Sequence, residues 1–414
     1  MTGVRQVAVA IVGGGPAGLT AAATLAPVVD GEVLVIERET HTGGIPCYSD
    51  HLGYGIRDLR RFISGPAYAR RLSEVARDAG AVLTTEAMVT GWAGPHRLAV
   101  TSPAGRQIVE ADAVVLATGA RERPRAARLI PGDRPDGVYT TGALQQMVHR
   151  HRRPVGTRAL IVGAELVSWS AVLTLREAGC TPVAMTTVYP HSEAYTAFRI
   201  PGQLLIRGPV LGRTRMVSIT GSDRVESAVV EHLDTGRRTT IDCDTVVFTG
   251  DWIPDHELAR SGELQMDPAT RGPVVDAGLR TSRPGVFAVG NLLHPVDTAA
   301  GAALDGRHVG PAVQSWLKDR RYNAAGIRLR TDAPLRWVTP QLIPADGHGS
   351  ARGDLRFWLD EYVRMPKLLA VQNNRVIGST RTLWPAAPGR IYRAPWTLVS
   401  GADPAGGEVT ISLR

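Results

Sequence analysis

A continuous apolar run near the start of the chain is followed by a glycine-rich turn and then by a helix-like stretch. The apolar run covers residues 7–12, the turn is Gly13-Gly14-Gly15-Pro16-Ala17-Gly18, and the helix-like pattern covers residues 19–29. A second apolar run, Val33–Ile36, ends at Glu37. Strand, glycine turn, helix, strand and acid in this order predict a dinucleotide-binding unit.

Each part of this unit has a physical task. Gly13 permits the tight turn, Gly15 lets the backbone approach a pyrophosphate, and Gly18 lets the helix pack closely against the strand. The amino end of the helix then faces the phosphates with N–H groups and a positive dipole end. Glu37 lies 19 positions after Gly18 and is placed to accept hydrogen bonds from a ribose.

Two later strand ends add to this pattern. An apolar run over residues 114–116 ends in Ala117-Thr118-Gly119, which resembles the strand by which two-domain flavoproteins leave their FAD domain. Another run over residues 286–289 ends in Gly290-Asn291 and resembles the second FAD motif of the same proteins. In those flavoproteins the polar side chain after that glycine binds the ribityl chain of the flavin, and the resemblance implies the same role here. Asn291 replaces the usual aspartate, so a hydrogen-bonding group is kept without its charge.

A second strand-helix-strand pattern is inserted between these landmarks. Residues 158–162, 166–177 and 181–186 predict strand, helix and strand, and residues 225–233 and 245–248 predict further strands. The fold class is therefore α/β, with two Rossmann-like dinucleotide-binding domains and a small β-rich C-terminal appendage. We expect an FAD-binding domain at 1–125 and 273–330, an NAD(P)-like domain at 126–272 and a β-rich domain at 331–414.

The second glycine turn departs from a working nucleotide motif. In residues 163–168, Glu165 and Ser168 stand where glycines are expected. A carboxylate against a pyrophosphate costs several kcal/mol at low dielectric, whereas a helix dipole offers about 0.3 to 1 kcal/mol. Residues 186–189 also supply neither a ribose-binding acid nor an arginine for a 2′-phosphate. The turn predicts poor nicotinamide binding; the alternatives are a tolerated variant that still binds NAD(P)H, or a site for another nucleotide.

Charge and composition exclude several partner classes. The formal charge is +8, but Lys318 and Lys367 are the only lysines. The basic run at residues 149–153 has no interleaved aromatic residues, which favours a solvated turn over a nucleic-acid site. No apolar run approaches the roughly 18 residues of a membrane span. The first apolar run ends in a glycine loop rather than a cleavage site, so we expect a cytoplasmic protein.

The cysteines limit redox and metal chemistry. Cys47, Cys180 and Cys243 are far apart and form no C-x-x-C motif, so a disulfide framework is not expected. Cys47 lies near where flavin disulfide reductases carry their first redox cysteine, but it has no partner nearby, and we interpret it as a small apolar residue. A [2Fe–2S] centre needs about four thiolates. We expect no metal centre in this chain alone.

The chain resembles a branch of the pyridine nucleotide-disulphide oxidoreductase superfamily, the FAD-containing α subunits of hydrogen cyanide synthase, opine oxidase and related amino-acid dehydrogenase complexes. The resemblance extends from the first glycine turn to His308 and is most specific in the FAD domain. The usual C-terminal cysteine cluster of that branch is absent after Cys243. The residues that carry the resemblance are Gly43-Gly44-Ile45-Pro46, residues 65–69, 117–124, 141–142, 163–165, 290–295 and 304–308.

The resemblance implies FAD as the cofactor and a set of residues that bind it. It also implies that a helix opening at Thr298-Ala299, and predicted to run to about Leu317, points its amino end at the flavin. His294, Asp297, Asp305 and His308 near this helix are interpreted as structural polar residues. The implied FAD-binding residues are Gly13, Gly15, Pro16, Ala17, Gly18, Glu37, Arg38, Gly44, Ile45, Val89, Ala117, Thr118, Gly119, Gly290, Asn291, Thr298 and Ala299.

The leading functional hypothesis is an FAD-dependent oxidoreductase that serves as the flavoprotein subunit of an amine or amino-acid oxidase or dehydrogenase complex. Its partners would be other flavoprotein or iron–sulfur subunits and a small amine or amino-acid substrate. The alternatives are a single-chain NAD(P)H-dependent reductase of a ferredoxin-like protein, and a non-catalytic FAD-binding scaffold. No catalytic residue can be assigned, since the isoalloxazine carries the electrons and the protein supplies position and electrostatics.

Overall fold

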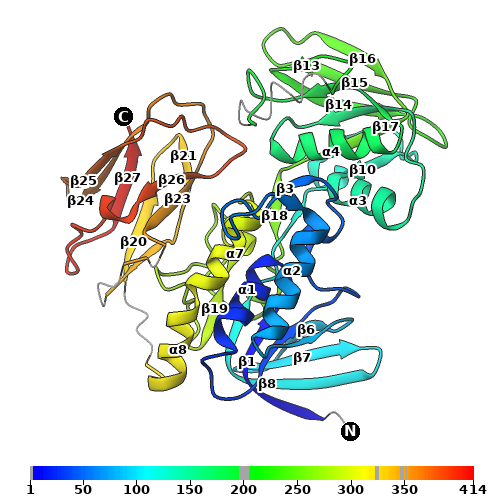
Figure 1. Cartoon of the computed structure of the whole chain (residues 1–414). Coiled ribbons are helices and arrows are strands. Elements are labelled where there is room, and N and C mark those ends of the chain that lie inside the picture. Colours follow the sequence, from blue (N-terminus) through cyan, green and yellow to red (C-terminus); the bar gives the residue numbers. More distant parts are fainter. Residues whose placement is uncertain (1–2, 195–204, 322–325, 346–348, 351) are drawn as a thin grey trace.

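The computed structural model describes residues 3–194, 205–321, 326–345, 349–350 and 352–414. The molecule consists of two α/β bodies and one all-β body (Figure 1). This arrangement confirms the predicted fold class of two Rossmann-like units with a β-rich appendage. The predicted domain limits stay a prediction.

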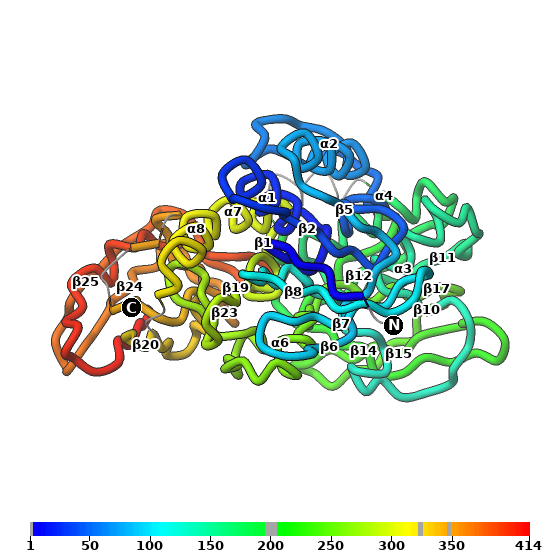
Figure 2. Tube along the Cα trace, turned by 90° about the horizontal axis from the view of Figure 1, so that it is seen from below, coloured from blue at the N-terminus to red at the C-terminus, as the bar shows by residue number. Residues whose placement is uncertain are grey.

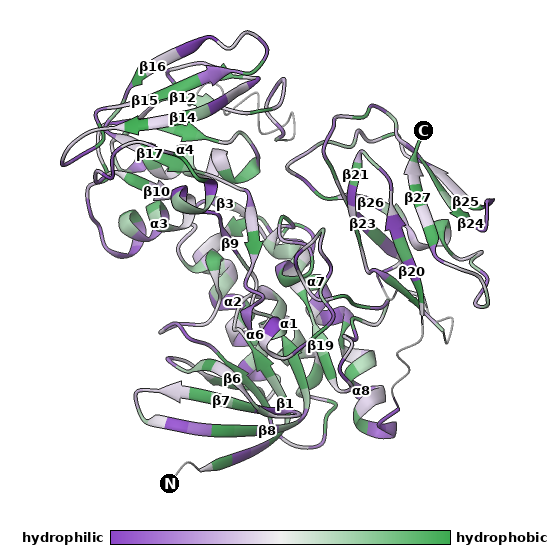
Figure 3. Cartoon of the chain, turned by 180° about the vertical axis from the view of Figure 1, so that it is seen from behind, coloured by the Kyte–Doolittle hydropathy of each residue, from purple (hydrophilic) through white to green (hydrophobic). Residues whose placement is uncertain are grey.

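A seven-stranded sheet forms the centre of the first body, in the order β5-β2-β1-β8-β7-β6 with β19 beside β8. The central strands β1, β2, β8 and β19 run parallel. Their buried stretches, residues 9–12 of β1, all of β2 and residues 113–116 of β8, are hydrophobic (Figure 3), as expected for parallel strands covered on both faces. The first half of β8 carries polar residues. Helices α1, α2 and α7 lie together on one face (Figure 2). The bounds are β1 (Val4–Val12), β2 (Val33–Ile36), β5 (Val82–Thr84), β6 (Met88–Gly94), β7 (Arg97–Ser102), β8 (Gly105–Leu116), β19 (Val286–Ala288), α1 (Pro16–Leu25), α2 (Gly65–Asp78) and α7 (Ala299–His308).

The second body repeats the dinucleotide-binding pattern. Its parallel sheet has the order β10-β17-β11-β12-β13, and a three-stranded antiparallel sheet, β14-β15-β16, lies beside it. The predicted ranges 158–162, 166–177, 181–186 and 245–248 are the observed elements β11, α4, β12 and β17. The bounds are β10 (Val138–Thr140), α3 (Thr141–Gln145), β11 (Arg158–Val162), α4 (Leu166–Glu177), β12 (Thr181–Thr186), β13 (Val210–Leu211), β14 (Thr214–Thr220), β15 (Ser227–His232), β16 (Arg238–Asp242) and β17 (Thr245–Phe248).

The C-terminal body consists of two sheets, β22-β20-β27-β24-β25 and β21-β23-β26. Its core is separate from the cores of the other two bodies and includes Leu355, Phe357, Leu368 and Ile411. The β-rich appendage predicted from the short alternating runs is confirmed. The bounds are β20 (Gly326–Thr331), β21 (Leu335–Thr339), β22 (Leu342–Pro344), β23 (Asp354–Leu359), β24 (Lys367–Gln372), β25 (Arg375–Arg381), β26 (Tyr392–Pro395) and β27 (Val409–Leu413).

Two predicted helices differ from the observed ones. Helix α1 ends at Leu25 rather than residue 29, and the helix predicted from Thr298 to about Leu317 is two helices, α7 and α8 (Gly310–Asp319). The break at Gly310-Pro311 has a simple cause, because proline donates no N–H and clashes with the preceding turn. The remaining short elements are η1 (Ile45–Cys47), β3 (Leu52–Tyr54), β4 (Ile63–Ser64), β9 (Ala120–Glu122), η2 (Arg125–Arg128), η3 (Gln146–Arg150), β18 (Trp252–Pro254), α6 (Glu257–Ser261), η4 (Gly290–Leu292) and η5 (Trp396–Leu398).

No helix in the described part of the chain is both long enough and apolar enough to span a membrane.

Candidate functional site

The first glycine turn is open toward the amino end of α1. Gly15 is the N-cap residue of α1, no side chain caps this helix end, and Pro16 begins the helix. A Cβ added at Gly15 would meet no atom within 4 Å, whereas one at Gly18 would lie 2.0 Å from the Gly13 carbonyl oxygen. Gly13 itself has φ +105°, which favours glycine. The turn thus combines tight packing at Gly18 with free space and N–H groups at Gly15, as phosphate binding requires.

Glu37 is buried beside this turn at the end of β2. Its carboxylate accepts hydrogen bonds from the Gly14 N–H at 2.7 Å and the Glu39 N–H at 2.9 Å. The Ala87 N–H donates to the Glu37 carbonyl oxygen at 2.9 Å, and Val89 follows two residues later on β6. The acid that sequence assigns to the ribose therefore also fixes the turn.

Three more predicted residues lie in loops near the turn. Gly44 has φ +65°, and a Cβ on it would lie 3.1 Å from the Gly15 Cα. Ile45 follows Gly44 and is partly exposed. Arg38 is an exposed side chain 3.6 Å from the Asp255 carboxylate. Gly44 therefore lies against the phosphate turn, Ile45 follows it, and Arg38 lies beside Asp255.

The exit strand also ends at the turn. A Cβ on Gly13 would lie 2.5 Å from the Ala117 carbonyl oxygen, so the two chain segments are in contact. The Thr118 hydroxyl donates to the Asp255 carbonyl oxygen at 2.7 Å, and the Asp255 N–H donates to the Gly119 carbonyl oxygen at 2.9 Å. These bonds hold Ala117, Thr118 and Gly119 in one conformation beside the turn.

The second FAD-like motif packs against α1. Gly290 has φ +73°, and a Cβ on it would lie 2.8 Å from the Ala17 Cβ. The Asn291 Nδ2 group donates to the Asp297 carbonyl oxygen at 3.0 Å. Its buried Oδ1 atom has no hydrogen-bond partner among the described residues. A buried acceptor without a partner is costly, so a ligand hydroxyl at this position would satisfy it.

The predicted flavin-facing end of α7 begins at Thr298-Ala299. The Thr298 hydroxyl accepts a hydrogen bond from the Gly301 N–H at 3.2 Å. The Thr298 N–H donates to the Asp297 carboxylate at 2.8 Å. Part of the positive helix end is therefore neutralised by the chain itself.

These segments, distant in sequence, meet in the arrangement that a recognised family shares. The chain matches the family model described as pyridine nucleotide-disulphide oxidoreductase over residues 7–306. The chain belongs to this family. The family and its structural neighbours are FAD-dependent oxidoreductases, so this chain is an FAD-dependent oxidoreductase and its cofactor is FAD. The open turn at Gly15 and the unpartnered Asn291 Oδ1 fit this cofactor.

The pairwise identity to individual relatives is low. An opine oxidase subunit from Rhizobium meliloti is 27% identical over 313 residues, which cover 68% of this chain and 58% of that protein. Ferredoxin–NADP reductase of Ignicoccus hospitalis is 26% identical over 292 residues, covering 68% of this chain and 88% of that protein. The crystal structure of T. acidophilum thioredoxin reductase superimposes with a TM-score of 0.63 at 20% identity, over 75% of this chain and 98% of that one. The last similarity concerns the fold alone.

A buried ion-pair network ties α7 to the C-terminal body. Arg352 and Arg356 each approach the Asp305 carboxylate at 2.7 Å, and Arg393 donates to Asp297 at 2.9 Å. His294 Nε2 lies 2.5 Å from the same Asp305 carboxylate. Burial raises the pKa of Asp305, but Arg356 and His294 outweigh it and hold this pKa well below its usual range.

This network agrees with the structural role expected for His294, Asp297 and Asp305. The three arginines were not foreseen, because they lie far from α7 in sequence and no local motif marks them. The His308 Nε2 atom lies 2.8 Å from the Ala277 carbonyl oxygen, which also agrees with a structural role.

The second glycine turn is occupied by the chain's own side chains. Glu165 is the N-cap residue of α4, and a Cβ on Gly250 would lie 1.5 Å from the Glu165 Oε1 atom. The carboxyl group is therefore folded against Gly250. Ser168 is fully buried, and its hydroxyl shares a hydrogen bond of 2.7 Å with the Thr249 hydroxyl. The sequence predicted that the charge of Glu165 would repel a pyrophosphate. This prediction needs correction, because burial raises the pKa of this carboxyl group and so favours its neutral form.

Two further carboxyl groups lie near Glu165. Burial, together with the Glu165 charge, raises the pKa of Glu193 to about 8 and that of Glu122 to about 7. The Thr187 hydroxyl donates to Glu193 at 2.9 Å, and the Gly142 N–H donates to Glu122 at 2.8 Å. The second turn is thus an acidic, partly protonated site, which sequence spacing could not reveal.

The cysteines are free thiols, as the spacing predicted. Cys47 donates to the Thr42 carbonyl oxygen at 3.3 Å, and burial raises the pKa of its thiol. A raised pKa lowers the thiolate fraction and therefore the reactivity. Among the described residues, no group of three or more histidine, cysteine or acidic side chains is placed to bind a metal.

Proposed function

We propose that this chain is the FAD-containing subunit of a complex that oxidises an amine or an amino acid. The observation that carries the proposal is the second glycine turn, where Glu165 and Ser168 take the place of the usual glycines. The Glu165 carboxyl group lies against Gly250, and the Ser168 hydroxyl forms a buried hydrogen bond with Thr249. A chain with this turn is poorly suited to take electrons from a nicotinamide. The electrons would then come from an organic substrate or from a partner protein.

The FAD-binding residues are proposed as a set. Gly13, Gly15, Pro16, Ala17 and Gly18 would hold the pyrophosphate at α1, and Glu37 would accept hydrogen bonds from the ribose. Bound FAD supplies the two-electron acceptor for oxidation of a C–N bond. The remaining proposed contact residues are Arg38, Gly44, Ile45, Val89, Ala117, Thr118, Gly119, Gly290, Asn291, Thr298 and Ala299.

The chain's own contribution is positioning. Asn291 would hold the ribityl chain through its Oδ1 atom, while its Nδ2 group stays bonded to the loop before α7. The ion pairs of Asp297 and Asp305 with the C-terminal arginines keep α7 in place. A fixed helix end is what a preorganised flavin site requires.

Partner subunits are part of the proposal. The Rhizobium meliloti relative is one component of opine oxidase, and this chain spans 58% of its length. The three free cysteines are too few for an iron–sulfur centre, so such a centre would belong to another chain. Other flavoprotein or iron–sulfur subunits are therefore the proposed partners, and a cytoplasmic location stays a prediction.

One observation favours a second candidate, a single-chain NAD(P)H-dependent reductase of a ferredoxin-like protein. The relative named ferredoxin–NADP reductase is matched over 88% of its length. This candidate requires that a dinucleotide bind at the second turn despite Glu165. The third hypothesis, a non-catalytic scaffold, does not agree with the family match, because the family consists of oxidoreductases.

Anaerobic stopped-flow mixing of the FAD-loaded chain with NADH or NADPH separates the two candidates. We expect the flavin absorbance to change slowly with either nucleotide at sub-millimolar concentration. Addition of the chains encoded beside this one, with amino acids or N-alkylated amino acids as substrates, should then give fast reduction. Flavin bleaching by NADPH within a second would contradict the proposal and establish the reductase.

A further inference from the structure

Two segments of the C-terminal body pair with each other and extend beyond its sheets. Val363 and Ala386 exchange two backbone hydrogen bonds of 2.9 Å, and the Thr382 N–H donates to the Pro366 carbonyl oxygen at 3.1 Å. We call residues 360–366 and 382–391 the arm. The arm reaches from the C-terminal body toward α4 of the second body (Figure 1).

The arm contacts the second body at two places. The Tyr362 ring packs edge-on against the His191 ring, with 5.6 Å between the ring centroids. A Cβ on Gly389 would lie 2.8 Å from the Glu193 Cβ and 3.1 Å from the Glu165 Cβ. Gly389 also has φ +74°, a conformation that other residues rarely adopt. The arm tip therefore lies directly on the acid of the second glycine turn.

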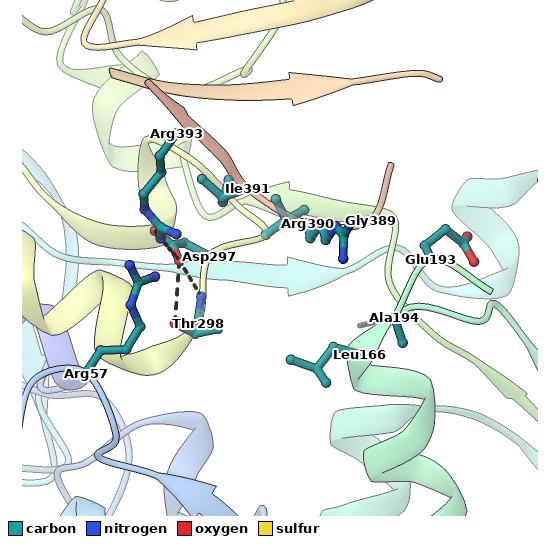
Figure 4. Close-up of a pocket in the computed structure, with 11 residues that line it drawn as sticks. Arg57, Leu166, Glu193, Ala194, Asp297, Thr298, Gly389, Arg390, Ile391 and Arg393 are labelled. Atoms are coloured by element: carbon teal, nitrogen blue, oxygen red, sulfur yellow. Dashed lines mark hydrogen bonds and ion pairs between the residues drawn. The ribbon is translucent and has the colours of Figure 1, made fainter. Parts of the chain in front are cut away.

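Little space is left between the arm and the turn. A cavity of about 40 Å³ is lined by Leu166 and Glu193 of the second body, by Gly389 and Arg390 of the arm, and by Asp297 and Thr298 before α7 (Figure 4). Small-molecule sites usually measure about 300 to 1,000 Å³. The cavity extends from the amino end of α4, where a pyrophosphate would bind, to the amino end of α7, and it is far too small for a dinucleotide.

We propose that the arm tip, centred on Gly389, is the specificity-determining element that closes the second nucleotide site to NAD(P)H. The site keeps its Rossmann-like backbone but holds a segment of its own chain. The proposal assigns a role to the C-terminal body and does not depend on which amine or amino acid is oxidised.

The arm is built to stay in place. Pro385 and Pro388 restrict the backbone on either side of Ala386, which lowers the entropy lost when the tip is ordered. Beyond the tip, Arg393 is anchored to Asp297 by hydrogen bonds of 2.9 and 3.0 Å. The arm is held on one side by the Val363–Ala386 pairing and on the other by Arg393. A stiff segment that is anchored at both ends has a high effective concentration at the turn.

A disulfide trap tests the position of the arm. We expect Gly389→Cys combined with Glu193→Cys to form a disulfide with oxidised glutathione in the FAD-loaded chain, detected by peptide mass mapping. The close approach of the two Cβ positions needs a shift of about 1 Å to reach disulfide geometry. The control pairs Glu193→Cys with Gly236→Cys in the exposed turn between β15 and β16, and should not cross-link. Absence of a cross-link in the first pair overturns the proposal.

Nucleotide binding tests the role of the arm. The turn variant Glu165→Gly plus Ser168→Gly restores the glycines but keeps the arm. We expect NADP⁺, measured by calorimetry, to bind at least about tenfold tighter when residues 387–390 of the turn variant are also replaced by two glycines. The same replacement at the exposed residues 234–237 serves as the control and should leave the affinity unchanged.

Equal affinity with and without the arm tip would show that the arm excludes nothing and would overturn the proposal. Micromolar binding of NADP⁺ to the unaltered chain would overturn it as well. Neither measurement uses flavin reduction, so their outcome is distinguishable from a failure of the proposed amine or amino-acid oxidation. If the shortened chain does not fold, the disulfide trap still decides where the arm lies.

Discussion

The two glycine turns of this chain have almost the same backbone conformation, but the space beside the first is open and the space beside the second is filled by the chain itself. The N-cap residue of α1, Gly15, has φ −78° and ψ −175°, and that of α4, Glu165, has φ −79° and ψ −176°. At Gly15 nothing lies within 4 Å of an added Cβ. At Glu165 the carboxyl group and the tip at Gly389 fill the corresponding space. A Rossmann-like backbone therefore does not by itself make a nucleotide site.

The difference shows which part of the motif carries function. Both turns keep a first glycine with positive φ, Gly13 and Gly163, because the strand-to-helix bend requires it. Of the two positions that lack glycine, Glu165 corresponds to Gly15, which faces open space, and Ser168 corresponds to Gly18, which packs against the first glycine. The strand-to-helix bend needs the first glycine in either turn, whereas the space beside the N-cap residue matters only for a ligand.

The largest effect is expected from a substitution that fills the open space beside the first glycine turn. Gly15→Val should lower FAD affinity by at least about a hundredfold, or about 2.7 kcal/mol, because its side chain would occupy the pyrophosphate position. The melting temperature of the FAD-free chain should not change, since no protein atom lies within 4 Å. Flavin absorbance per protein and differential scanning fluorimetry measure the two effects. Gly3→Val, at an exposed position where an added Cβ also meets no atom within 4 Å, is the control; full flavin content in Gly15→Val would place the cofactor elsewhere.

A weaker effect is expected at the acid beside the first turn. Glu37→Ala should weaken FAD binding by about 1 to 3 kcal/mol, because it removes a charged hydrogen-bond acceptor. This corresponds to about 5- to 150-fold in the dissociation constant, measured by fluorescence titration of the apoprotein with FAD. Glu39→Ala, whose side chain is exposed, should bind FAD normally. If both variants bind equally well, Glu37 serves only to fix the turn.

The buried carboxyl groups at the second turn should make the stability of the folded chain depend on pH. The pKa of Glu193 is raised to about 8 by burial and by Glu165, so the folded state holds more protons than the unfolded state above the ordinary carboxyl pKa. Stability should therefore fall as the pH rises from about 4.5 to about 8. Glu193→Gln should reduce this loss and stabilise the chain at pH 8 by about 1 to 3 kcal/mol.

Urea unfolding at pH 5 and pH 8 measures this effect. The control Glu226→Gln changes an exposed carboxylate of the same body and should leave the pH dependence as it is. A Glu193→Gln variant that is less stable than the parent chain at pH 8 would contradict the assignment of a buried, protonated carboxyl group.

The smallest effect is expected at Cys47. Cys47→Ser should change flavin content and the rate of flavin reduction less than about twofold, because a serine hydroxyl also donates to the Thr42 carbonyl oxygen. Anaerobic reduction by the physiological donor, or by dithionite where no donor is known, provides the measurement. A large loss of rate would show that Cys47 takes part in catalysis.

The sequence by itself determined many of the local elements and the glycine turn of the first body. Apolar runs, glycines and an acid at fixed spacing specified β1, the turn and Glu37, because each depends only on neighbours along the chain. Several strands of the second body were also predicted to the residue. Two helix ends were predicted wrongly: α1 ends before residue 29, and the predicted helix after Thr298 is divided near Gly310-Pro311, because a helical pattern continued through a proline that the backbone could not accommodate.

Only the tertiary structure decided what occupies the second turn and how α7 is held. Glu165 was visible in the sequence, but its burial depends on contacts with Gly250 and with Gly389, and the second of these lies more than two hundred residues away. The same holds for Arg352, Arg356 and Arg393, whose partners are Asp297 and Asp305. Contacts between distant segments leave no periodic signal in a single sequence, since they are fixed by the packing of whole bodies rather than by local spacing.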